Sequence, residues 1–125
     1  MKGGEVIELI SDLGGGKTTL VRGIARGAGS PAVVGSPTFT ISKLYPATKC
    51  DIHHFDFYRL NEAGLVAFEL HDILVDPHAV VVVEWGDIVH DALPPERLTI
   101  QIEKTADGKR KLTCNTPNHL QYLMP

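Results

Sequence analysis

The sequence predicts one α/β domain in which a mixed sheet is flanked by helices. Segments with a helical period alternate along the chain with segments of strand type. A continuous run of valines at residues 80–83 indicates a parallel strand that is buried on both faces. The Asp107-Gly108 pair between two alternating segments indicates an antiparallel hairpin. The chain has 125 residues, which is enough for one domain with its own core.

Composition and charge are those of a soluble globular protein, and the net charge argues against strong nucleic-acid binding. Apolar residues make up 43% of the chain, charged residues 22%, and the formal net charge is −3. This acidic balance gives no electrostatic footprint for strong nucleic-acid binding. The sequence has neither an apolar run long enough to span a membrane nor a signal-peptide pattern, so we expect a cytoplasmic protein. Cys50 and Cys114 lack metal-binding spacing, and we expect both to be small buried residues in reduced form.

A glycine-rich segment joins the first predicted strand, at residues 6–10, to a helix predicted over about residues 18–26. The segment reads Ser11-Asp12-Leu13-Gly14-Gly15-Gly16-Lys17-Thr18-Thr19. Strand, glycine-rich turn, Lys-Thr and helix is the order that a phosphate-binding loop needs, because backbone N–H groups and the helix N-terminus then surround the phosphate. In such a loop Lys17 contacts the β- and γ-phosphates, and the Thr18 hydroxyl holds Mg²⁺.

The full loop pattern has glycine at its first position, where this chain has Ser11. Glycine adopts backbone angles that serine resists, so the substitution predicts weaker nucleotide binding wherever the loop requires those angles. The alternative interpretation is a glycine-rich turn that only connects strand to helix. The phosphate-binding interpretation is favoured because the strand and the helix both stand where the motif requires them.

Two extended segments follow, and we expect them to pair as an antiparallel hairpin. The first covers residues 35–45 and is closed by Pro46, and the second covers residues 50–58. At the start of the first segment, the sequence Ser36-Pro37-Thr38 could present hydroxyls to a γ-phosphate, as switch segments do in other nucleotide hydrolases. A plain strand-initiating turn explains this tripeptide without a ligand and is the favoured interpretation of the segment taken alone.

The second half of the chain predicts further helices and strands. Asn61 is the expected N-cap of a helix over residues 62–71, whose inward side carries Leu65 and Phe68. The other expected elements are the strand at residues 80–83, a short helix at 87–93, a half-buried strand at 98–103 and its hairpin partner at 109–115.

Glu84 directly follows the buried valine run and is the first candidate for chemistry beyond phosphate binding. Ligands of open α/β sheets bind beyond the carboxyl ends of parallel strands, so an acid at this position can serve a bound nucleotide. It could hold a metal ion directly, hold it through water, or orient the attacking water. The alternative is a strand-end carboxylate that caps a neighbouring helix.

The segment His54-Phe55-Asp56-Phe57-Tyr58 is the second candidate. On a strand, His54, Asp56 and Tyr58 share one face, and the two phenylalanines share the other. Asp56 could then reach the Mg²⁺ shell, and His54 could hydrogen-bond a phosphate or a carboxylate. An ordinary amphipathic strand with a surface histidine and aspartate explains the spacing equally well.

These motifs, in this order, resemble the bacterial TsaE (YjeE-like) P-loop ATPases of tRNA threonylcarbamoyladenosine biosynthesis. The stretches that carry the resemblance are Asp12 to Thr19, Ser36-Pro37-Thr38-Phe39, His54-Phe55-Asp56-Phe57-Tyr58-Arg59-Leu60, Val83-Glu84-Trp85 and Leu93-Pro94 with Glu96-Arg97-Leu98. The resemblance covers roughly residues 4–112. It implies a P-loop NTPase-like mixed sheet, binding of ATP and Mg²⁺, and weak ATP hydrolysis.

The resemblance also implies partners and residue roles. The family supports modification of adenosine 37 in tRNA together with the subunits TsaD and TsaB, so we expect contact with tRNA to be indirect and no membrane partner. Carried over by motif, Lys17 binds phosphate, Thr18 and Asp56 serve the metal, and Glu84 completes the hydrolytic site and its metal shell. The rest of the nucleotide-binding segment comprises Asp12, Leu13, Gly14, Gly15, Gly16 and Thr19.

The sequence departs from the family at two places. Ser11 stands where the family has glycine, and we expect this single domain of residues 1–125 to lack the helix and strand that precede the phosphate loop in the family. Both departures leave an alternative function open: a nucleotide-sensing interaction module with negligible ATP turnover. A small-molecule kinase is a weaker alternative, because no separate lid segment or phosphoacceptor site is evident.

Overall fold

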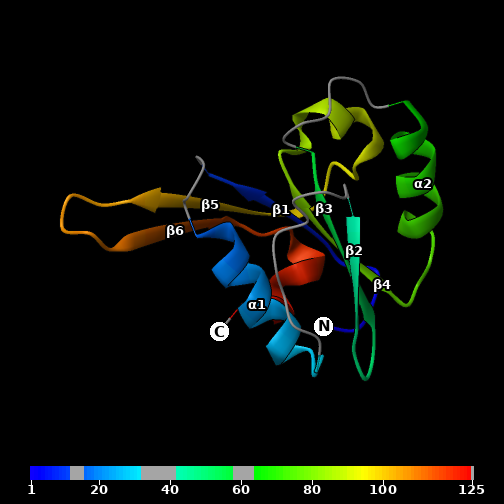
Figure 1. The fold of residues 1–125 in the computed structure, drawn as a ribbon, viewed down its shortest axis with the longest axis horizontal. Helices are drawn as coiled ribbons and strands as arrows, with labels where there is room; N and C mark the ends of the chain where they lie inside the picture. Colours follow the sequence, from blue (N-terminus) through cyan, green and yellow to red (C-terminus); the bar gives the residue numbers. More distant parts are fainter. Residues whose placement is uncertain (12–15, 32–41, 58–63, 125) are drawn as a thin grey trace.

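The computed structural model describes residues 1–11, 16–31, 42–57 and 64–124, which form one six-stranded sheet with helices on both faces (Figure 1). The strands are β1 (Val6–Ile10), β2 (Ser42–Pro46), β3 (Asp51–Asp56), β4 (Ala79–Glu84), β5 (Leu98–Lys104) and β6 (Arg110–Asn115). Their order across the sheet is β2-β3-β4-β1-β5-β6. The inner strands β3, β4, β1 and β5 are parallel, and the edge strands are antiparallel to their neighbours. The predicted mixed α/β sheet is confirmed.

Strand β4 lies in the middle of the sheet, and its four valines are at most 1% exposed. It pairs in parallel with β3 on one side and with β1 on the other. Val80 and Val82 belong to the core on one face, and Val81 and Val83 belong to the core on the opposite face. The valine run is therefore a strand buried on both faces, as its composition predicts.

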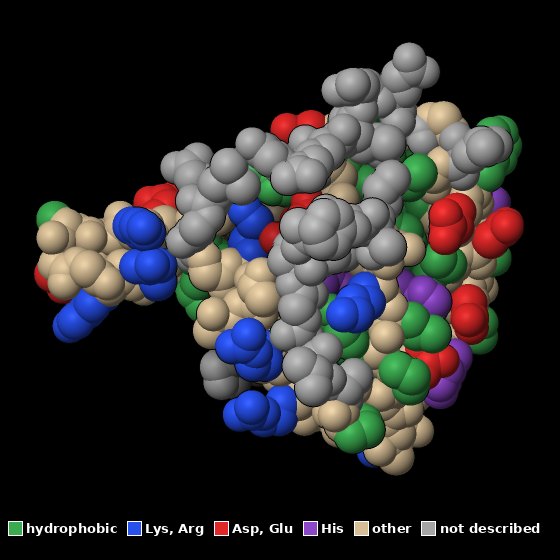
Figure 2. Space-filling view, viewed as in Figure 1, with side chains coloured by type: hydrophobic (Ala, Val, Ile, Leu, Met, Phe, Trp, Pro, Cys, Tyr) green, Lys and Arg blue, Asp and Glu red, His purple; other side chains and the backbone are tan. Residues whose placement is uncertain are grey.

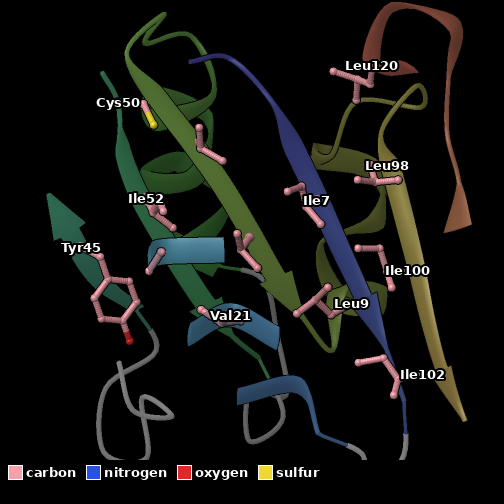
Figure 3. Packing of buried hydrophobic residues seen from close by; sticks show 13 residues of the cluster. Ile7, Leu9, Val21, Tyr45, Cys50, Ile52, Leu98, Ile100, Ile102 and Leu120 are labelled. Atoms are coloured by element: carbon pink, nitrogen blue, oxygen red, sulfur yellow. The ribbon is translucent and has the colours of Figure 1, made fainter. Parts of the chain in front are cut away.

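Helix α1 (Lys17–Gly27) covers the first face of the sheet. Val21 and Ala25 of this helix are at most 1% exposed and pack on side chains of the central strands (Figure 3). The C-terminal 3₁₀ segment η2 (Asn118–Leu123) joins the same core through Leu120. In Figure 1 this segment, drawn in red, lies beside α1.

Helix α2 (Gly64–Leu74) and the 3₁₀ segment η1 (Gly86–Ala92) cover the second face. The prediction that Phe68 faces inward is wrong, because this side chain is 73% exposed and Leu70 is the fully buried residue. With about 3.6 residues per turn, positions two apart lie on nearly opposite sides of a helix. The expected N-cap Asn61 and the side chain of Leu65 lie outside what the structure describes.

Both predicted hairpins are present, and residues 35–41 and 58 of the first predicted hairpin lie outside the described part of the chain. Strands β2 and β3 pair from Ser42↔Phe55 to Pro46↔Asp51, and β5 and β6 pair from Thr99↔Asn115 to Lys104↔Arg110. The second hairpin projects from the body of the molecule in Figure 1. Cys50 is buried as expected, but the expectation of a buried Cys114 is wrong because β6 is an exposed edge strand.

Candidate nucleotide-binding site

Three parallel strands end at one edge of the sheet and bring the predicted site residues together. β4 ends at Glu84, which is the register partner of Asp56 at the end of β3 and of Leu9 near the end of β1. Because β1 leads into α1 through the glycine-rich segment, both carboxylates lie at the edge where that segment begins. This juxtaposition is the one that the sequence predicts for a ligand site at the carboxyl ends of parallel strands.

The helix α1 begins directly at the predicted phosphate-binding residues. Gly16 is its N-cap, with φ 99° and ψ 15°, a left-handed conformation that favours glycine. Gly16 has no side chain that could cap this helix end. Thr18 is half-buried and Thr19 is exposed in the first turn. The expected loop residues Asp12, Leu13, Gly14 and Gly15 lie outside the described part of the chain.

Lys17 is only 7% exposed and points back toward the strand ends. Its Nζ donates to the backbone oxygen of Ser11 at 3.1 Å and to the Ser11 hydroxyl at 3.3 Å. The same ammonium group lies 4.7 Å from the ring centroid of Trp85, within the range of a cation–π contact. The serine that replaces the expected glycine therefore adds a hydroxyl contact to the lysine.

Trp85 follows Glu84 in an unusual backbone conformation. Its φ of 57° and ψ of 49° are left-handed, and it is the one non-glycine residue with positive φ among those described. A bulky residue in this conformation costs about 1–3 kcal/mol, and the conformation persists only where the surrounding structure fixes it. The turn places the indole ring over Lys17, so it joins the end of β4 to the start of α1.

Glu84 forms a buried contact with His54. The two side chains are 4% and 0% exposed, and Glu84 Oε2 lies 2.5 Å from His54 Nε2. Of the two uses expected for His54, the structure shows the contact with a carboxylate, and the alternative of a surface histidine is wrong. Strand periodicity gives the face on which His54 lies, but it does not reveal that α1 and Tyr45 cover that face.

The second ring nitrogen of His54, Nδ1, is buried and has no hydrogen-bond partner among the described residues. Asp56, two residues further along β3, is half-buried. The third polar residue expected on this face, Tyr58, and the tripeptide Ser36-Pro37-Thr38 fall outside the described residues.

The ion pair between Glu8 and Arg97, which the sequence pattern did not reveal, lies against the Trp85 turn on the second face of the sheet. Glu8 of β1 is 5% exposed, and its Oε1 accepts from Arg97 Nη2 at 2.8 Å and from Nε at 2.9 Å. Arg97 Nη1 also donates to the backbone oxygen of Pro94 at 2.9 Å. A Cβ at Gly86 would lie 2.7 Å from Glu8 Oε2, so the turn packs directly on this carboxylate. The signal in the sequence was a glutamate inside an otherwise apolar strand.

The fold and this strand-edge site define a P-loop NTPase-like protein, a class that binds nucleotides. The sequence model of the family described as threonylcarbamoyl adenosine biosynthesis protein TsaE matches residues 1–112. The chain therefore belongs to the TsaE family, as its motifs predict. Within the described residues, no helix has the length and apolar character needed to cross a membrane.

Two relatives of the same name and one solved structure agree with this assignment. The tRNA threonylcarbamoyladenosine biosynthesis protein TsaE of Bacillus subtilis is 39% identical over 116 residues, which cover 90% of this chain and 70% of the relative. The protein of the same name from Streptomyces coelicolor is 38% identical over 120 residues, covering 90% and 80%. The crystal structure of Bacillus subtilis YdiB superimposes with a TM-score of 0.78 at 35% identity, covering 98% of this chain and 76% of that one.

Proposed function

We propose that this protein binds and slowly hydrolyses ATP in support of threonylcarbamoyladenosine modification of tRNA at position 37. The observation that carries the proposal is the meeting of Lys17, Asp56 and Glu84 at one edge of the sheet in a member of the TsaE family. Relatives that are 38% and 39% identical carry the name of this biosynthetic pathway, which supports the role in tRNA modification.

Lys17 is proposed to bind the β- and γ-phosphates, with the loop residues Asp12 to Gly16 and Thr19 contributing contacts around them. Its described contacts include the Ser11 oxygens and the Trp85 ring, which hold the ammonium group at the start of α1. Phosphate oxygens are stronger partners for an ammonium ion than neutral oxygens or a ring face.

Thr18, Asp56 and Glu84 are proposed to hold Mg²⁺. Hydroxyl and carboxylate oxygens are the hard donors that this ion prefers, and the register pairing of Asp56 with Glu84 supports the set. When bound, Mg²⁺ would neutralise charge on the phosphate oxygens. The residues therefore fit the ion that the family implies.

Glu84 is also proposed to orient the attacking water and accept its proton. The water oxygen bonds to the γ-phosphorus, the bond from that phosphorus to the bridging oxygen breaks, and ADP leaves with the bridging oxygen. His54, at 2.5 Å from Oε2, holds the carboxylate in one orientation while this occurs. We assign His54 a positioning role, since it acts through Glu84.

TsaD and TsaB are the proposed partners, and contact with tRNA is proposed to be indirect. The net charge of −3 supports an indirect role, because a protein that binds tRNA alone needs cationic surface to neutralise phosphates. The same pathway would place the protein in the cytoplasm. A nucleotide-sensing module with negligible turnover is the second candidate, favoured by Ser11 at the first position of the loop.

ATP turnover with Mg²⁺ in three variants tests the hydrolytic assignment. Lys17→Ala and Glu84→Gln should each lower the rate by about 100-fold or more, because each removes stabilisation of the reacting phosphate or water. Glu103→Gln, an exposed carboxylate on β5, is the matched control and should keep the parental rate. Equal rates in the parent, Lys17→Ala and Glu84→Gln would contradict the assignment, and ATP binding without turnover would favour the sensing module.

A further inference from the structure

The buried ion pair between Glu8 and Arg97 lies on the second face of the sheet, beside the strand-edge site. The two side chains are 7% and 10% exposed. Glu8 belongs to β1 and is the register partner of Val83 in β4, and Arg97 directly precedes β5. None of the roles proposed above for phosphate, metal or water uses either charge.

Stability alone does not explain why two charges are buried at these positions. Transfer of both groups out of water costs energy that their attraction offsets only in part, and apolar side chains of similar volume often give equal or greater stability. Val6, two residues before Glu8 on the same face of β1, belongs to the apolar core of this face. An apolar side chain at position 8 would extend that core. A charged pair differs from it in holding its atoms by hydrogen bonds of defined direction.

Arg97 holds the carboxylate of Glu8 in one orientation. Its Nη2 and Nε donate to Glu8 Oε1 at 2.8 Å and 2.9 Å, and its Nη1 donates to the backbone oxygen of Pro94 at 2.9 Å. The planar guanidinium therefore ties β1 to the segment between η1 and β5 through a rigid fork. With Oε1 bonded to Arg97, the other oxygen, Oε2, faces the backbone turn of Trp85 and Gly86.

This carboxylate oxygen lies in direct contact with the Trp85 turn. A Cβ at Gly86 would lie 2.7 Å from Glu8 Oε2 and 3.1 Å from Val83 Cγ1. Gly86 is not among the described glycines with positive φ, so its backbone angles are open to other residues. The close approach of Glu8 is what requires glycine at position 86. The carboxylate therefore sets how near the turn lies to the sheet.

The Trp85 turn in turn carries groups of the candidate site. Glu84 directly precedes Trp85, and the indole ring centroid lies 4.7 Å from Lys17 Nζ. The left-handed φ of 57° at Trp85 needs support from neighbouring structure, and Glu8 lies against the next residue of the turn. Displacement of the turn would move the ring beside Lys17 and the end of β4 together.

We propose that Glu8 and Arg97 are positioning residues that act through the Trp85 turn on Lys17 and Glu84. Arg97 orients Glu8, Glu8 supports the turn at Gly86, and the turn holds the two site residues in place. The effect on ATP turnover rests on the proposed function, whereas the effect on the position of Trp85 does not.

An apolar replacement of the pair separates positioning from stability. Trp85 is the one tryptophan of the chain, so quenching of tryptophan fluorescence by acrylamide reports the exposure of this turn. Glu8→Leu combined with Arg97→Met leaves no unpaired charge and should keep the urea midpoint close to that of the parent. The same double variant should be quenched more strongly and should lose about 10-fold to 100-fold in kcat for ATP, because small displacements of reacting groups are costly.

The matched control removes the same two types of charge from the β5–β6 hairpin. Glu103 and Lys111 are exposed register partners on β5 and β6. Figure 2 shows Lys and Arg side chains on the surface of the projecting hairpin, in contrast to the buried Arg97. Glu103→Leu combined with Lys111→Met should keep the parental quenching and the parental kcat.

A conservative variant keeps the test decisive where the double variant does not fold. Arg97→Lys retains a positive charge beside Glu8 but lacks the planar fork that bonds Glu8 and Pro94 together. It should show the same two changes at smaller size. Arg26→Lys, at an exposed arginine of α1, is its control and should match the parent.

The outcomes separate this inference from the proposed function. Parental quenching together with parental kcat in the folded variants would overturn the positioning role and leave the proposed function standing. Stronger quenching with a parental kcat would overturn the effect on turnover. A parent protein that hydrolyses no ATP would overturn the proposed function, and quenching of Trp85 would then decide alone whether the pair positions the turn.

Discussion

Charged side chains are buried at the strand-edge site and exposed on the β5–β6 hairpin. At the strand edge, Glu84 and Glu8 are at most 5% exposed, and each has a basic partner within 2.8 Å. On the hairpin, Lys109 and Asp107 are exposed and their charged atoms are 3.9 Å apart. Burial fixes the geometry of the first region, whereas the second is open to solvent. Substitutions at the strand edge should therefore alter stability and turnover, and substitutions of these exposed hairpin charges should leave the free energy of unfolding close to that of the parent.

Removal of Arg97 should have the largest effect on stability. Arg97→Ala leaves Glu8 as a buried charge without its partner, and breaking such a pair costs about 3–5 kcal/mol. Urea unfolding measures this loss, with Lys109→Ala on the hairpin as the control whose midpoint should not move. Similar midpoints for the two variants would show that the two regions do not differ as proposed.

Replacement of His54 should have the next largest effect and should also lower turnover. His54→Leu leaves the buried Glu84 carboxylate without its donor and should lower the free energy of unfolding by about 2 kcal/mol. His78→Leu, at an exposed histidine that lies 3.8 Å from Asp51, should stay within about 0.5 kcal/mol of the parent.

A rescue experiment separates positioning by His54 from simple packing. His54→Gln can still donate to Glu84 and should recover part of the ATP turnover that His54→Leu loses. The positioning role is wrong if both variants unfold at the same urea concentration and hydrolyse ATP at the parental rate.

The contact between Tyr122 and Glu5 joins a buried side chain to an exposed one. Its loss should lower the free energy of unfolding by less than the strand-edge substitutions and by more than the hairpin control. The Tyr122 hydroxyl donates to Glu5 Oε2 at 2.5 Å, and Glu5 is 2% exposed whereas Tyr122 is 46% exposed. Tyr122→Phe should lower the free energy of unfolding at neutral pH by about 1 kcal/mol, measured by urea unfolding. A loss as large as that of Arg97→Ala would break the ranking by burial.

The same contact predicts a pH dependence with a defined sign. Burial and the hydrogen bond to Glu5 raise the pKa of Tyr122 from 10.0 to about 12. The stability that the Tyr122 hydroxyl contributes is therefore complete below pH 10 and is lost as the pH rises through 12. Burial alone would raise the pKa of Glu5, but hydrogen bonds from Tyr122 and the Lys2 and Gly3 backbone lower it below 4.5. The stability that the ionised Glu5 carboxylate contributes is present above pH 4.5 and is lost as the pH falls through the lowered pKa of Glu5. Thermal unfolding of Tyr122→Phe across this range should show a smaller alkaline loss than the parent.

Local pattern was sufficient for much of the fold. The valine run, both hairpins and the β1–α1 junction follow from periodicity and turn chemistry, and the pairing of Asp56 with Glu84 follows from the edge that parallel strands share. Phe68 was placed wrongly because a helix rich in apolar residues all round gives no unique inward side.

Contacts between distant residues were the part that pattern could not supply. Glu8 and Arg97 are separated by 89 positions, and His54 and Glu84 by 30. The sequence shows that each residue is charged or polar, but only the packing of both helical layers shows that it is buried and must be paired.

A crystal structure with a non-hydrolysable ATP analogue and Mg²⁺ tests the central claim most directly. We expect the γ-phosphate at Lys17 and the metal within the oxygen shell of Thr18, Asp56 and Glu84. An analogue whose phosphates lie away from the start of α1, or whose metal contacts neither carboxylate, would contradict it.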